Sequence, residues 1–204
     1  MILFLFDRLH ARSGMSLLRS FLLSIPLLLS ACAVQSDKPL STPRYSDRDP
    51  RLEGLWRAKT DKDTLYFYIA YGPGAHGSIL LFGKDEKGMG AELLDFFVTR
   101  TPKHTYLNLI TRGEIESGHL HAQKSRMYSF QEYHFSWTGQ LVVSAVGGEA
   151  FSKAIKEGKL HGKVEQFVIT ISHTPSERIL AFIEGSKPED VFIKAYSATR
   201  IGSP

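Results

Sequence analysis

A single cysteine, Cys32, occurs in the 204-residue chain, so no intramolecular disulfide can form. A disulfide-stapled scaffold is excluded, and the stability of the fold has to come from its hydrophobic core. The chain also lacks a Gly-x-Ser-x-Gly elbow and a His-Glu-x-x-His helix, and no cysteine beyond residue 32 is available as a nucleophile. These absences argue against the common hydrolase chemistries, and we expect a protein that is not an enzyme.

Charge of one sign and metal-ligating clusters are also scarce. Beyond residue 32 the chain has 22 basic and 20 acidic residues, and no block of Lys and Arg is interleaved with aromatic side chains. We therefore expect no nucleic-acid partner. His119 and His121 would point to the same side of a strand, but no third ligand is apparent nearby. We interpret them as surface histidines and predict neither a metal nor a cofactor.

Long hydrophobic runs are limited to one stretch, Phe21–Ala31, which reads FLLSIPLLLSA. It is shorter than the roughly 20 apolar residues that span a bilayer. Arg19 precedes it and small residues end it, which is the pattern of a secretory signal. We favour Met15 as the translation start, because Asp7 is unusual in the positive region of such a leader.

The end of this stretch, Leu29-Ser30-Ala31-Cys32, resembles the lipobox of bacterial lipoproteins. The resemblance implies that residues 1–31 are a signal peptide and that Cys32 is lipidated and becomes the first residue of the mature protein. Three acyl chains would anchor it to a membrane far more firmly than one. Ala33 in the following position favours the periplasmic face of the outer membrane, within the bacterial cell envelope.

Residues 33–50 contain three prolines, few apolar side chains and no periodicity. This composition predicts a flexible tether that follows the lipidated Cys32, so that 32–50 form the anchor region. Fully extended, such a segment reaches about 60 Å. Residues 51–204 are then long enough to form one domain with its own core.

This domain is dominated by segments that are rich in β-branched and aromatic residues and alternate with period two. Short turns join many of them, which indicates antiparallel hairpins. The predicted strands cover 64–71, 78–82, 92–99, 105–111, 127–137, 140–146, 164–172 and 191–198. In 127–137 the apolar side chains change phase, which predicts a β-bulge near Gln131 and Glu132.

Two segments have helical spacing instead, 148–159 and 175–185. We expect them to cover an end or edge of the sheet. The predicted fold is mainly β: a single antiparallel up-and-down barrel of about eight strands with two short helices.

The first strand opens with Gly54-Leu55-Trp56, a Gly-x-Trp that resembles the first signature of lipocalin-like (calycin) barrels. The resemblance implies that Gly54 and Trp56 close one end of the barrel, with an Arg of the last strand over the indole. Arg200 is in a suitable position for that role. No Thr-Asp-Tyr-like second signature follows, and the long C-terminal helix of lipocalins is missing.

Bulky aromatic side chains are spread over several predicted strands, as in a barrel that holds a ligand. The candidate lining residues are Tyr66, Tyr68, Phe97, Phe130 and Trp137. An eight-stranded barrel can enclose one small ligand or be filled by its own side chains. We expect a non-catalytic lipoprotein that binds a small apolar or amphipathic ligand. The alternative is a filled barrel that serves protein interaction or envelope assembly, with a protein partner that the sequence does not identify.

Overall fold

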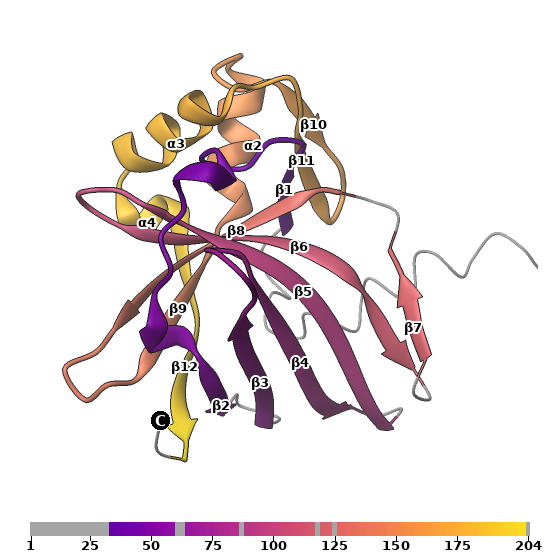
Figure 1. The fold of residues 1–204 in the computed structure, drawn as a ribbon. Helices are drawn as coiled ribbons and strands as arrows, with labels where there is room; N and C mark the ends of the chain where they lie inside the picture. Colours follow the sequence, from indigo (N-terminus) through magenta and orange to yellow (C-terminus); the bar gives the residue numbers. More distant parts are fainter. Residues whose placement is uncertain (1–32, 60–63, 86–87, 117–118, 124–125, 203–204) are drawn as a thin grey trace, which may run out of the picture.

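The computed structural model describes residues 33–59, 64–85, 88–116, 119–123 and 126–202. Its central feature is a closed antiparallel barrel of eight strands, which confirms the predicted fold class (Figure 1). In chain order these strands are β2 (Gly54–Lys59), β3 (Thr64–Tyr71), β4 (Gly77–Asp85), β5 (Gly88–Arg100), β6 (Thr105–Glu116), β8 (Tyr128–Phe135), β9 (Leu141–Val146) and β12 (Phe192–Ile201).

Each barrel strand pairs with the next one along the chain, and β2 pairs with β12 to close the ring. The pairing of β8 with β6 bypasses β7 (His119–Ala122), a short strand that pairs antiparallel with the end of β6. Most pairings in the wall therefore join strands linked by short turns, as the sequence predicts, whereas β9–β12 and β12–β2 join segments that are distant in sequence.

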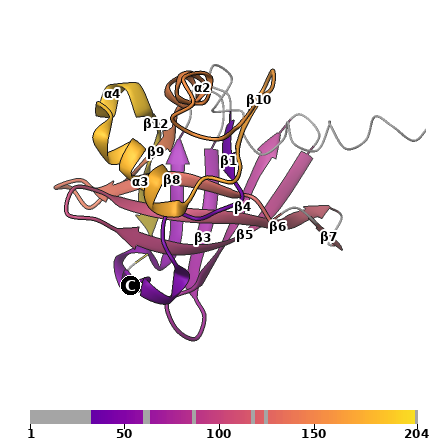
Figure 2. The same ribbon diagram turned by 90° about the horizontal axis from the view of Figure 1, so that it is seen from above.

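The longest excursion from the barrel lies between β9 and β12 and carries the helices. It contains α2 (Gly148–Lys156), β10 (Gly162–Val164), β11 (Val168–Ile171), α3 (Ser176–Gly185) and α4 (Pro188–Val191). The two longer helices match the two predicted ones, and α4 is one additional turn. Figures 1 and 2 show all three helices on the same side of the molecule as β10 and β11.

Residues 33–50 do not form the tether that their composition predicts. Strand β1 (Ala33–Ser36) pairs in parallel with β11 and meets the start of β8 at Tyr128. Leu40 is buried, and its backbone N–H donates to the Asn108 side chain at 2.7 Å. Two 3₁₀ turns, Pro43–Tyr45 and Pro50–Leu52, lead into β2. The prediction was wrong because the partners of this segment lie far away in sequence, where local composition gives no sign of them.

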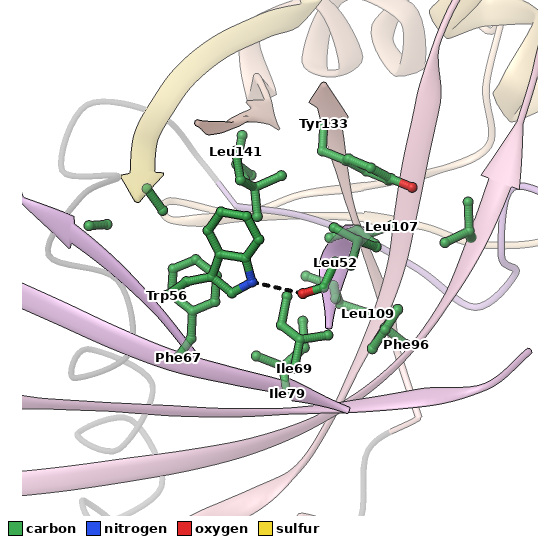
Figure 3. Close-up of a cluster of buried hydrophobic side chains, with 14 residues drawn as sticks. Leu52, Trp56, Phe67, Ile69, Ile79, Phe96, Leu107, Leu109, Tyr133 and Leu141 are labelled. Carbon is green, nitrogen blue, oxygen red and sulfur yellow. Dashed lines mark hydrogen bonds between the residues drawn. The ribbon is translucent and has the colours of Figure 1, made fainter. Parts of the chain in front are cut away.

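Two hydrophobic cores lie on opposite sides of the barrel wall. The first fills the closed part of the barrel around Trp56 and Phe67 (Figure 3). The second packs the helices and the β1–β11 pair against the outer face of β6 and β8, with Tyr106 and Phe130 among its members.

These two cores also explain the phase change in β8. Phe130 belongs to the outer core, whereas Tyr133 belongs to the inner one. The register of β8 against β6 and β9 is regular, so the bulge predicted at Gln131 and Glu132 does not exist. Register shifts occur instead between Leu93 and Leu94 and between Lys194 and Tyr196.

Candidate functional site: the barrel cavity and its closed end

One end of the barrel is closed by Trp56 on β2 and by Leu52 from the preceding 3₁₀ turn. The indole N–H donates to the Leu52 carbonyl oxygen at 2.7 Å, and both side chains are fully buried (Figure 3). The Phe67 ring stacks at 6.5 Å from the indole. A buried indole N–H needs an acceptor, and the turn supplies it, so the entry segment acts as a plug for the barrel.

Arg200, near the end of β12, lies over the same indole with its guanidinium carbon 4.8 Å from the ring centre. It also donates a hydrogen bond to the Arg51 carbonyl oxygen. Gly54 has φ of +120°, a backbone conformation that side chains disfavour, and the Arg200 side chain passes beside it. The structure thus brings together Gly54, Trp56 and Arg200, the three residues that the lipocalin resemblance selects.

A buried carboxylate, Asp49, holds the plug in place. Its side chain forms a two-point ion pair with Arg51, at 2.9 and 2.7 Å, and accepts a hydrogen bond from the Tyr133 hydroxyl at 3.0 Å. Burial alone would raise the pKa of Asp49, but the hydrogen bonds from Arg51 and Tyr133 outweigh it and lower the pKa. Asp49 is therefore ionised at neutral pH and ties the turn to β8.

Above this closed end the barrel is hollow. A cavity of about 180 Å³ runs between the strands, and most of its walls are aliphatic. The apolar lining comes from β3, β4, β5, β6 and β9: Leu65, Phe67, Ile69, Ile79, Leu81, Leu94, Leu107, Leu109, Leu141, Val143 and Ala145. The interior side chains of this barrel leave room for a small ligand.

A few polar side chains interrupt the apolar wall. Glu92 on β5 accepts a hydrogen bond from the Thr111 hydroxyl on β6 at 3.0 Å, and Gln131 and Ser129 of β8 also line the cavity. Burial raises the pKa of Glu92, and the charge of Glu114 raises it further. Glu114 is the direct cross-strand partner of Glu92. Two glutamates in that arrangement repel each other, and no ion pair to either occurs among the described residues.

Tyr196 lines the cavity from β12, and its ring packs edge-on against Phe67 at 5.7 Å. Burial raises the pKa of its hydroxyl, which is therefore neutral at physiological pH. Within the described part of the chain this hydroxyl has no hydrogen-bond partner, so it is available to a ligand.

The open end of the cavity is bordered by β1. Ala33, Val34 and Gln35 line it together with Met127, just before β8. Strand β9 leaves β8 beyond Ala145, and β1 takes the vacated position beside the start of β8. The N-terminal segment is thus part of the cavity wall.

Of the five aromatic residues expected to line a ligand site, only Phe130 borders the cavity, and its side chain belongs to the outer core; the other four are not among the lining residues. Tyr66 stacks on Phe82 at 5.6 Å outside the barrel, and Tyr68 on the same face is 50% exposed. Phe97 is buried on the outer face against Tyr128.

Trp137 is 97% exposed in the turn between β8 and β9.

The expectation that Tyr66 and Tyr68 line the cavity was wrong because β3 carries large apolar side chains on both faces. Alternation defines two faces but does not say which of them points inward.

The polar cavity residues were missed by the sequence reasoning, although one signal was present. Glu92, Leu94 and Phe96 occupy alternate positions of one strand and therefore share a face. A glutamate in phase with two core side chains indicates a charge that points into a barrel. Tyr196 gave no comparable signal, because the register shift in β12 lies directly before it.

His119 and His121 lie on β7 with exposed side chains. No group of three or more His, Cys, Asp or Glu side chains that could hold a metal occurs in the ranges that the structure describes. Cys32, the predicted lipidation site, lies outside the described residues, as does the predicted signal peptide, 1–31.

Among the residues that the structure describes, no helix is both long and apolar enough to cross a bilayer.

Fold and cavity together define a closed eight-stranded antiparallel β-barrel protein with a hollow interior. Comparisons with known proteins add no relative: the chain matches no protein-family model, no curated protein and no solved structure.

Proposed function

We propose that this chain is a membrane-anchored envelope lipoprotein whose lipocalin-like barrel binds a small apolar or amphipathic ligand without chemical conversion. The observation that carries the binding role is the cavity of about 180 Å³ with its aliphatic walls. An apolar protein cavity of about 150 Å³ takes up one benzene molecule. The ligand portion inside the barrel is accordingly the size of one ring or a short alkyl chain.

The polar side chains at the cavity favour an amphipathic ligand over a purely apolar one. The Tyr196 hydroxyl and the Gln131 amide can each hydrogen-bond a ligand head group, while the aliphatic wall takes up its tail. The closed end is stabilised by Trp56, Arg200 and Asp49, which are engaged in contacts with the protein itself. In this proposal they hold the barrel in shape and do not contact the ligand.

Binding is tested on a chain that begins at Ala33, exported to the periplasm so that β1 is kept. Native mass spectrometry and solvent extraction identify any molecule that copurifies, and calorimetric titration with 1-hexanol measures occupancy of the emptied barrel. Ala145→Phe places a ring in the cavity, and the matched control Ala122→Phe places one on the exposed strand β7.

We expect one hexanol per chain for the wild type and for Ala122→Phe, and loss of binding for Ala145→Phe. Equal binding by both variants would place the ligand elsewhere. Failure of the wild type to bind any apolar probe would favour the alternative role in protein interaction or envelope assembly.

The anchor is tested separately on the full chain. Cys32→Ser should abolish incorporation of labelled fatty acid and leave an uncut precursor. Normal maturation of that variant would contradict the lipoprotein proposal while leaving ligand binding unaffected.

A further inference from the structure

The chain enters the domain at the rim of the cavity. The backbone N–H of Ala33 donates to the Phe167 carbonyl oxygen at 3.1 Å, and Ala33 pairs with Val168 of β11. Ala33 and Gln35 themselves line the cavity mouth. A flexible tether of 18 residues would let the domain move tens of ångströms from its anchor. Because β1 is part of the sheet, a membrane anchor directly before Ala33 would also fix the position of the cavity mouth.

Beside this entry point the hairpin of β10 and β11 exposes apolar side chains. Phe167 is 69% exposed and Val164 is 39% exposed. The charges between and next to them cancel, because Lys163 pairs with Glu165. An exposed Phe and Val next to a membrane anchor are suited to the lipid–water interface, where apolar side chains insert a short distance into the headgroup region.

The opposite end of the barrel has a different character. Arg48, Arg51 and Arg200 gather around the plug, and their guanidinium groups lie over Tyr71, Phe135 and Trp56 respectively. These cations are committed to the closed end of the fold. Trp137, exposed in the turn that follows Phe135, marks that end.

From this arrangement we infer that the β10–β11 hairpin rests on the membrane, with Phe167 and Val164 in the bilayer interface and the cavity mouth directed toward the lipid. The inference rests on the proposed lipidation of Cys32 and adds an orientation to it. A ligand from the bilayer then reaches the cavity beside β1 without crossing bulk water.

The test uses the full-length, lipidated chain in phosphatidylcholine vesicles that contain a lipid with a nitroxide near the headgroup. One reporter is Phe167→Trp in a Trp137→Phe background. The matched reporter is the native Trp137 at the closed end, and the buried Trp56 contributes the same background to both.

We expect the nitroxide lipid to quench the indole introduced by Phe167→Trp at least twofold more than Trp137, and aqueous iodide to quench Trp137 more strongly. A third variant carries both Phe167→Ser and Val164→Ser. In this variant iodide should quench a fluorescent label at position 35 more strongly than it quenches the same label without the two serine substitutions.

Equal quenching of both reporters by the lipid, or strong iodide quenching at position 167, would overturn the inference. Fatty-acid labelling of the same sample separates the proposed lipidation from the proposed orientation. A labelled chain with a solvent-exposed position 167 contradicts the orientation alone. An unlabelled chain contradicts both the lipidation and the orientation. Hexanol binding reports on the cavity in either case.

Discussion

Arg200 and Trp56 are joined across the β12–β2 pairing, where they are direct cross-strand partners and the guanidinium lies 4.8 Å from the indole ring centre. Arg200 also donates a hydrogen bond to the Arg51 carbonyl oxygen. One side chain therefore connects β12, β2 and the plug before β2. We expect Arg200→Ala to lower the free energy of unfolding by about 1–2 kcal/mol, through loss of the cation–π contact and the hydrogen bond.

Urea unfolding followed by tryptophan fluorescence measures this change. Arg57→Ala is the matched control, because Arg57 follows Trp56 on β2 and its side chain is exposed; it should change stability by less than about 0.5 kcal/mol. If both variants lost the same amount, the contact with Trp56 would contribute nothing specific.

Asp49 makes the barrel plug sensitive to acid. Its carboxylate is 3% exposed and its pKa is lowered in the folded protein. A group with a lowered folded pKa stabilises the fold above its ordinary pKa, and this contribution is lost as the pH falls through the lowered value. We expect Asp49→Asn to cost about 1–3 kcal/mol at pH 7, because the hydrogen bonds from Arg51 and Tyr133 then meet a neutral side chain.

The measurement is the urea midpoint at pH 7 and again below pH 3, where the difference between Asp49→Asn and the wild type should shrink. Asp47→Asn, two residues earlier and exposed, should behave as the wild type at both values. A constant difference across this range would mean that the charge of Asp49 is irrelevant to stability.

Glu92 has the opposite dependence on pH. Its pKa is raised by burial, so its contribution is most favourable below the ordinary pKa of glutamate and is lost as the pH rises through the raised folded value. We expect Glu92→Gln to stabilise the protein at pH 8 by about 0.2–1 kcal/mol, the usual cost of like charges across a strand pair. At pH 4 the variant and the wild type should unfold at the same temperature.

Glu114→Gln should yield part of the same gain, because it removes the other half of the repulsion. The double variant should then gain less than the sum of the two single ones, as expected for residues that interact directly. If the stability gains of the two single variants in thermal unfolding added up fully in the double variant, the two carboxylates would not interact.

Gly77 is required by the close approach of β4 to the Phe96 ring. A Cβ at this position would lie 2.2 Å from Phe96 Cε1 and 2.9 Å from the Ala70 carbonyl oxygen. We expect Gly77→Ala to destabilise the barrel by about 1–3 kcal/mol, the usual cost of overpacking. Gly90→Ala is the control, since a Cβ there meets nothing within 4 Å. Chemical denaturation of the two variants should separate them clearly, and equal midpoints would refute the steric argument.

The strands and helices of the barrel could be predicted in large part from local pattern. Segments of alternating apolar residues separated by short turns can form little other than antiparallel hairpins, and both longer helices begin and end near Gly, Pro or Ser signals. Trp56 and Arg200 were selected through the resemblance of Gly54-Leu55-Trp56 to the first signature of lipocalin-like barrels. Apart from the pairing of β12 with β2 that closes the barrel, these features depend on residues that are close together in sequence.

The candidate site was less predictable, because it depends on which face of each strand points inward. On β3 the pattern of Tyr66, Phe67, Tyr68 and Ile69 is apolar on both faces, and the inward choice follows from the pairing with β2, where Phe67 is the partner of Trp56. Tyr196, the polar cavity residue on β12, comes directly after a register shift, which moves the inward–outward alternation by one residue. Which face of a strand points inward, and where its register shifts, is decided by pairing with strands that are adjacent in space.

The sequence by itself determined most strands of the barrel, both longer helices and the antiparallel hairpins, because hydrophobic alternation and turn chemistry act over a few residues. The tertiary structure alone decided that the barrel is hollow, that Glu92 and Tyr196 face the hollow, and that β1 completes its rim. A cavity is volume left over after all side chains are packed, and β1 pairs with a strand more than a hundred residues away. Both are properties of the assembled chain, which no short stretch of sequence contains.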